Sequence, residues 1–166
     1  MSILAIDPGN IESAFVVVTD DLSKVIDKGK LPNAELEEYI WSVPTKRWYR
    51  DDQVKHIAVE MVASYGMPVG AEVFETCVQI GRFERHIEIV WGNVINYQRI
   101  YRMEEKTAIC HNSRARDSNI RQALIDRFGA IGTKKNPGYF YGFKKDIWAA
   151  MAVAVTYHDK YLTARE

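Results

Sequence analysis

Short apolar runs separated by turn residues dominate the first thirty positions of the chain. Residues 3–6, 14–19 and 24–31 are rich in aliphatic and β-branched side chains, and the segments between them contain Pro8, Gly9 and several Asp, Asn and Ser residues. Such runs bounded by turn residues predict three strands. Because the connections are tight, we expect these strands to form an antiparallel meander.

The hydrophobic period changes after Pro32, where helices begin to alternate with strands. We predict helices at 34–41, with Asn33 as N-cap, and at 70–86, strands at 54–61 and 87–91, and further helices around 97–109, 115–128 and 145–162. The strand at 54–61 follows a helix and should therefore run parallel to the first strand. Three antiparallel strands followed by two parallel ones predict an α/β fold, a five-stranded mixed sheet flanked by helices, in a single domain spanning 1–166.

Composition adds a charge asymmetry to this picture. The chain has 166 residues, and its 22 Lys and Arg balance its 22 Asp and Glu. Residues 1–81 carry 7 basic and 13 acidic side chains, whereas residues 82–166 carry 15 and 9. This split allows a basic surface beside an acidic site, although a net charge of zero excludes a purely electrostatic DNA binder. Two cysteines and no long apolar run indicate a cytoplasmic protein with no membrane span.

Three acidic residues occupy unusual positions in the pattern. Asp7 ends an apolar strand, Glu60 lies near the end of another, and Asp146 precedes nine apolar residues at the start of the last helix. A carboxylate in a buried strand is costly unless it is paired or binds a cation. If the two strands are parallel neighbours, Asp7 and Glu60 converge, and Asp146 can join them. Such a group suits Mg²⁺ or Mn²⁺, although a turn, an exposed edge residue and a helix cap explain the same three residues.

The sequence around these acids resembles the RuvC family of Holliday-junction resolvases, which have an RNase H-like fold. The resemblance rests on Leu4-Ala5-Ile6-Asp7-Pro8-Gly9, on Ala58-Val59-Glu60 and on the segment from Lys145 to Ala152, in family order from residue 3 to about 158. Its divergent character is similar to the phage-encoded branch, which would place the protein in the cytoplasm of a bacterial host. Each motif alone is weak, whereas the three together on this strand order are fairly specific.

The resemblance implies a homodimeric endonuclease that cleaves branched DNA to leave 5′-phosphate ends. Asp7, Glu60 and Asp146 would then be catalytic metal ligands for Mg²⁺, with Mn²⁺ as a substitute and two ions in each site. Two departures stand out. Phe143 occupies the position of the family's fourth acid or histidine, for which Asp117 is a candidate replacement, and Ala63 occupies the position of an aromatic wedge, for which Tyr65 or Met67 would have to serve.

The basic half of the chain supplies candidate DNA contacts. Cations neutralise phosphates, and aromatic rings stack on unpaired bases. The predicted DNA-binding residues are Tyr65, Arg99, Arg102, Lys106, Arg114, Arg116, Lys144 and Lys145. Substrates would be four-way junctions, with Y-forks and flaps as further candidates. For any single residue a solvated helix face is the better explanation, whereas the set as a whole favours DNA contact.

Other functions are compatible with the same residues. The missing fourth acid is compatible with a catalytically weak module that only binds branched DNA. Asp7-Pro8-Gly9 also resembles a motif of actin-like ATP-binding domains, although 166 residues hardly accommodate the second lobe of such a protein. An RNase H acting on RNA–DNA hybrids is possible within the same fold.

Overall fold

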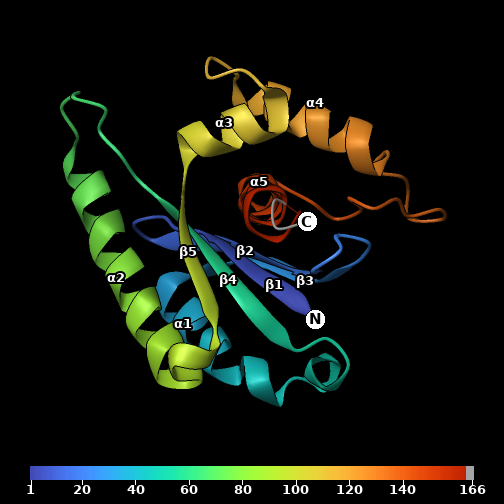
Figure 1. Cartoon of the computed structure of the whole chain (residues 1–166), viewed down its shortest axis with the longest axis horizontal. Helices are drawn as coiled ribbons and strands as arrows, with labels where there is room; N and C mark the ends of the chain where they lie inside the picture. The colour runs from blue at the N-terminus through green and yellow to red at the C-terminus, as the bar shows by residue number, and fades with distance from the viewer. Residues whose placement is uncertain (164–166) are drawn as a thin grey trace.

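The computed structural model describes residues 1–163, which form one five-stranded sheet with helices on both faces (Figure 1). In chain order the strands and α-helices are β1 (Ser2–Asp7), β2 (Glu12–Thr19), β3 (Val25–Pro32), α1 (Asn33–Ser42), β4 (Val54–Met61), α2 (Ala71–Trp91), β5 (Asn96–Tyr101), α3 (Arg102–Cys110), α4 (Asp117–Phe128) and α5 (Ile147–Tyr157). Short 3₁₀ turns follow α1 and α2, and a π-helical turn at His158–Leu162 extends α5.

The strand order in the sheet is β3-β2-β1-β4-β5. β1 and β2 are antiparallel, as are β2 and β3, whereas β4 runs parallel to both β1 and β5. The predicted fold class is therefore confirmed, including the three antiparallel and two parallel strands. The carboxyl ends of β1, β4 and β5, which all run in the same direction, lie at the same end of the sheet.

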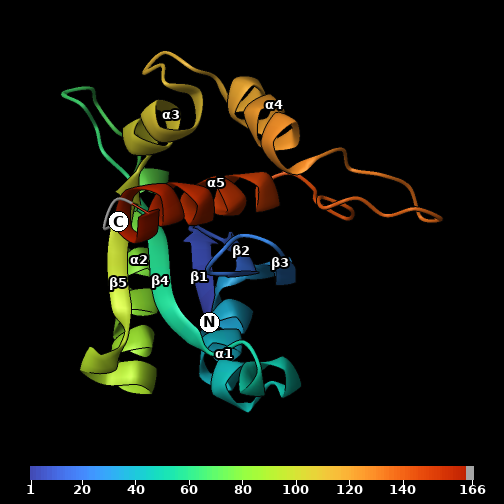
Figure 2. The same cartoon turned by 45° about the vertical axis from the view of Figure 1, so that its right-hand side comes forward.

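Alternation along the strands divides the core into two layers. Ile3 and Ala5 of β1 face α5, while Leu4 and Ile6 face the layer that holds α1 and α2. Figure 2 shows α5 lying across one face of the sheet, with α3 and α4 beyond it. Because α5 is covered on both sides, all its residues except Ala149 are buried. No helix within residues 1–163 is long and apolar enough to span a membrane.

The predicted position of the fifth strand is wrong. Residues 87–91 are the last turn and a half of α2, and the strand lies at Asn96–Tyr101, where a helix was expected. Phe83, Ile87 and Trp91 are spaced by four residues and are buried in the same core cluster, so helical packing overrides the β-branched composition of this stretch. β5 is an edge strand in which only Ile100 is fully buried, and its hydrophobic alternation is therefore weak.

One row of residues on α2, most of them apolar, points outward. Phe74 and Val78 are each 61% exposed, and Gly81 and Ile89 continue the exposed row along the helix. The buried side of α2 carries Thr76 and Gln79 as well as apolar residues. We name the exposed residues Phe74, Val78, Gly81 and Ile89 the α2 stripe.

Candidate functional site

Parallel pairing of β1 with β4 brings Asp7 and Glu60 together. Ile6 pairs with Val59, so the next residue of each strand lies at the same edge of the sheet. Strand alternation turns both side chains toward the face covered by α5, since Ala5 and Ala58 belong to that core layer. The two carboxyl groups are within hydrogen-bonding reach of each other. Burial, followed by the charge of Glu60, raises the pKa of Asp7, and burial also raises the pKa of Glu60.

The turn after Asp7 is held by a small polar network. Gly9 donates its backbone N–H to Ser13 Oγ over 3.0 Å, and Asn33 Nδ2 donates to the Gly9 carbonyl over 2.9 Å. Ser13 Oγ in turn donates to Asn33 Oδ1 over 2.7 Å. Asn33 was predicted as a helix cap, but it is the first residue of α1 and its side chain braces this turn. A Cβ at Gly9 would lie 2.3 Å from the Glu12 carbonyl oxygen, so the turn requires glycine.

Asp146 reaches the same region from the start of α5. Its charge contributes to the raised pKa of Asp7, which places it near the Asp7–Glu60 pair. Its Oδ2 lies 2.7 Å from Lys30 Nζ, however, and Lys30 also approaches Glu12 Oε2 at 3.4 Å. Lys30 pairs in register with Ala14 of β2 and so faces the α5 side of the sheet. The sequence does not single out Lys30 as a partner of Asp146, because it is one of two lysines in an edge strand far from Asp146 in the chain.

A fourth acid, Glu105 of α3, completes the cluster and was also missed. Its side chain is 0% exposed, and burial and the charge of Glu60 raise its pKa. Glu105 Oε2 pairs with Arg102, while Oε1 has no hydrogen-bond partner within residues 1–163. A signal was available in the sequence. Glu105 precedes Ile109 by four residues and therefore shares the inward face of α3, where a charged residue needs an explanation.

Arg102 lies among these acids rather than on an open surface. It pairs with Glu105 and with Asp117, and its charge partly offsets the rise that burial causes in the pKa of Glu60. Asp117, the candidate replacement for a fourth acid, is 90% exposed and is paired with this arginine. Phe143, at the position expected for that acid, packs between Phe140 and Trp148 with ring centroids 5.1 and 5.4 Å away. We name Asp7, Glu60, Glu105 and Asp146 the acidic cluster.

The acidic cluster provides the donor atoms that a divalent cation prefers. All its donor atoms are carboxylate oxygens. The charges of Asp146 and Glu105 add to that of Glu60 in raising the pKa of Asp7. One buried oxygen of Glu105 lacks a hydrogen-bond partner within residues 1–163. A cation would relieve this repulsion. As the side chains stand, no group of three His, Cys, Asp or Glu residues within 1–163 is arranged to hold a metal ion. Lys30 holds Asp146, so a cation that recruits Asp146 must displace this lysine, whereas Arg102 engages only one oxygen of Glu105 and leaves Oε1 without a hydrogen-bond partner within residues 1–163.

Most of the predicted DNA-binding residues are at least partly exposed, in the loop after β4, on α3, at the start of α4 or next to Asp146 in sequence. Tyr65 is 60% exposed in the loop after β4, and this loop and α3 stand at the same end of the sheet (Figure 2). Lys144 and Lys145 are exposed immediately before Asp146. The remaining surface cations of the predicted set are Lys106 of α3, Arg114 in the turn before α4 and Arg116 at the start of α4.

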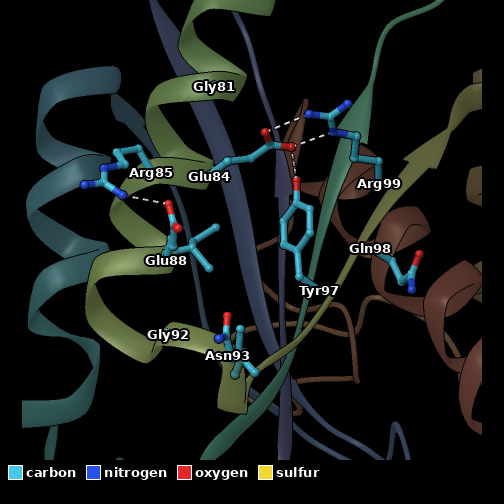
Figure 3. Close-up of a pocket in the computed structure, with 11 residues that line it drawn as sticks. Gly81, Glu84, Arg85, Glu88, Gly92, Asn93, Tyr97, Gln98 and Arg99 are labelled. Carbon is cyan, nitrogen blue, oxygen red and sulfur yellow. Dashed lines mark hydrogen bonds and ion pairs between the residues drawn. The ribbon is translucent and has the colours of Figure 1, made fainter.

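Arg99 is placed differently, in a groove of about 880 Å³ between α2 and β5. Figure 3 shows its guanidinium turned toward Glu84 of α2, with Tyr97 donating to the same carboxylate. Arg99 Nε lies 2.6 Å from Glu84 Oε1, and this contact lowers the pKa of Glu84. The groove lies on the α2 side of the sheet, so Arg99 is not part of the surface around the acidic cluster.

Comparison with solved structures identifies the fold. The chain is similar to the Thermus thermophilus RuvC structure, with a TM-score of 0.66 and 16% identity over 99% of this chain and 97% of that one. It is also similar to T. thermophilus RuvC in complex with a Holliday junction substrate, with a TM-score of 0.61, 16% identity and coverage of 95% and 92%. The yeast mitochondrial Holliday junction resolvase Ydc2 gives 0.56 and 12%, with coverage of 95% and 77%. No protein-family model and no curated protein sequence matches the chain.

Proposed function

We propose that this chain is a divalent-metal-dependent endonuclease that hydrolyses phosphodiester bonds in Holliday junctions and other branched DNA, leaving 5′-phosphate ends. The observation that carries the proposal is the meeting of Asp7 and Glu60 at the carboxyl ends of β1 and β4 in a chain with the RuvC fold. Fold alone does not fix substrate. The acids at this edge are what distinguish a nuclease from an unrelated protein on the same scaffold.

Asp7, Glu60 and Asp146 are the residues that would hold Mg²⁺, or Mn²⁺ in its place, with two ions in each site. Bound there, the ions would supply an activated water and neutralise charge on the scissile phosphate. The polar network at Gly9 braces the turn that follows Asp7. In the absence of a cation, the ion pair with Lys30 holds the Asp146 side chain in place and offsets the repulsion between Asp146 and Asp7.

The surrounding cations would hold the DNA strand against the acidic cluster. Lys144 and Lys145 adjoin Asp146 in sequence and are exposed, so they can reach phosphates next to the cleaved bond. Lys106 and Arg116 extend the basic surface over α3 and the start of α4. Tyr65 is exposed in the loop after β4, where its ring can stack on a base exposed at a branch point.

A homodimer would present two such sites to one branched substrate. The α2 stripe supports this arrangement, because it exposes Phe74 and Val78 on a long helix on the face of the sheet opposite α5. Gly81 lies within the stripe, and a Cβ added to it would meet no atom within 4 Å, which leaves room for a second helix.

Cleavage of a mobile four-way junction beside a Y-fork, in Mg²⁺ and with the ends mapped on every strand, tests the proposal. We expect nicks with 5′-phosphate ends from the wild type, and loss of cleavage with retained DNA binding for Asp7→Asn. Glu38→Gln on α1 is a matched control, because Glu38 is an exposed acid on the opposite face of the sheet. Equal cleavage by Asp7→Asn and wild type would refute the assignment.

A second candidate is a branched-DNA binding module with little catalytic activity. Two observations favour it: Asp146 is engaged in an ion pair with Lys30, and Phe143 stands at the position expected for a further acid. The same assay separates the two functions. Tight binding of the four-way junction without nicks in either Mg²⁺ or Mn²⁺ would favour the binding module.

A further inference from the structure

Glu105 is a buried carboxylate with one oxygen engaged and one left over. Oε2 accepts from Arg102, whereas Oε1 is enclosed by protein and has no hydrogen-bond partner within residues 1–163. A buried acceptor without a partner costs about 1–3 kcal/mol, so most native structures satisfy such atoms. The side chain is also completely inaccessible, which leaves solvent water little access to the free oxygen.

The Glu105 carboxyl group lies within electrostatic range of other acids. The charge of Glu60 acts on Glu105, and the charge of Glu105 acts on Asp7. α3 follows β5 directly, and β5 is the parallel neighbour of β4, so the first turn of α3 stands over the strand end that carries Glu60. A purely structural ion pair with Arg102 explains one oxygen of Glu105, but it does not explain why the other oxygen is buried without a hydrogen-bond partner within residues 1–163.

We propose that Glu105 is a metal ligand of this site, supplying from α3 a carboxylate oxygen to a divalent cation held by Asp7 and Glu60. This inference rests on the proposed function and adds a ligand to it. A hard cation such as Mg²⁺ or Mn²⁺ takes oxygen donors, and the unpartnered Oε1 is one. Arg102 orients the Glu105 carboxylate through the opposite oxygen, as a hydrogen-bonded partner of a ligating group does.

A consequence for α3 follows from this geometry. α3 carries Lys106 directly after Glu105, and its main contacts to other elements are to β5, α4 and α5. A cation bound by Glu105 and Glu60 ties the first turn of α3 to the sheet. Cation binding therefore orders the helix that carries a proposed phosphate contact, before any DNA is present.

Titration of the full-length, DNA-free protein with Mn²⁺, followed by electron paramagnetic resonance, tests the inference. Glu105→Gln keeps an oxygen for Arg102 and removes the charge. The matched control is Asp117→Asn, which removes the other carboxylate paired with Arg102 from an exposed position. We expect Glu105→Gln to weaken Mn²⁺ binding about tenfold or more, and Asp117→Asn to leave it within about twofold. Hydrogen exchange should show Mn²⁺ protecting α3 in the wild type and not in Glu105→Gln.

Wild-type Mn²⁺ affinity and wild-type protection of α3 in Glu105→Gln would overturn the inference. If that variant does not fold, Glu105→Asp decides, since it keeps the charge but withdraws the oxygens by one methylene group. Unchanged affinity in Glu105→Asp overturns the inference, and weakened affinity supports it. Asp7→Asn distinguishes failure of this inference from failure of the proposed function. If Asp7→Asn loses Mn²⁺ binding and the Glu105 variants do not, only the role of Glu105 as a ligand is refuted. Absence of Mn²⁺ binding by the wild type defeats the proposed function as well.

Discussion

Replacing Asp7 by asparagine should stabilise the metal-free protein, and increasingly so as the pH rises. Burial, the neighbouring Glu60 and the charges of Asp146 and Glu105 raise the pKa of Asp7 from 3.8 to about 9. Between these two values the folded state keeps a proton that the unfolded chain has released. The wild-type free energy of unfolding therefore falls as the pH rises through this interval.

The magnitude follows from the number of protons involved. One proton bound only by the folded state changes the free energy of unfolding by about 1.4 kcal/mol per pH unit. From pH 5 to pH 7 the wild type should lose up to about 3 kcal/mol through this site. Asparagine has no charge to lose, and its amide can donate to Glu60, so the variant should lack this slope.

Urea unfolding in the presence of EDTA, followed by tryptophan fluorescence at pH 5, 6 and 7, measures the difference. The stability of Asp7→Asn relative to wild type should grow across the series, while that of Glu38→Gln should stay constant. Added Mg²⁺ should then stabilise the wild type more than Asp7→Asn. Parallel loss of stability in wild type and Asp7→Asn from pH 5 to pH 7 would refute the reasoning, because it would mean that Asp7 is not held in a buried acidic environment.

Four further predictions address other parts of the molecule. Lys30→Met should tighten Mn²⁺ binding several-fold in a DNA-free titration, because it releases Asp146 from its ion pair; weaker binding would argue against competition. Gly9→Ala should lower stability by about 1–3 kcal/mol in urea unfolding, since its Cβ meets the chain at the turn, and an unchanged midpoint would contradict this. Val78→Asp should convert a dimer to a monomer in sedimentation experiments, whereas a monomeric wild type would exclude the interface. Tyr65→Ala should weaken four-way-junction binding more than duplex binding in gel-shift assays, and equal losses would assign the ring no role at the branch.

Local signals account for the parts of the fold that the sequence predicted well. The first three strands are short, apolar and joined by turns rich in Asp, Gly and Ser, so pairing between neighbours follows from the chain itself. The strand at Val54–Met61 was placed correctly for the same reason. The stretch at 87–101 was not, because Ile87 and Trp91 are buried as part of a helix face and the true strand is an exposed edge with little alternation.

The candidate site likewise has residues that local sequence identifies and residues that it does not. Asp7 and Glu60 were recognisable because each is a charged residue at the end of an apolar strand, and parallel pairing then joins them. Arg99 and Arg102 look alike in the sequence, because each is a basic residue within two positions of a tyrosine. One pairs with Glu84 on the α2 side of the sheet, and the other is enclosed by Glu105 and Asp117.

The sequence by itself thus determined the strand ends and the two acids they carry, because hydrophobic period and turn chemistry are properties of neighbouring residues. Only the tertiary structure decided that Glu105 is buried among those acids and that Lys30 holds Asp146. Both depend on contacts between elements far apart in the chain, namely α3 over the end of β4 and β3 beside the start of α5. A carboxylate acquires its unusual chemistry from its burial and its neighbours, and packing supplies both.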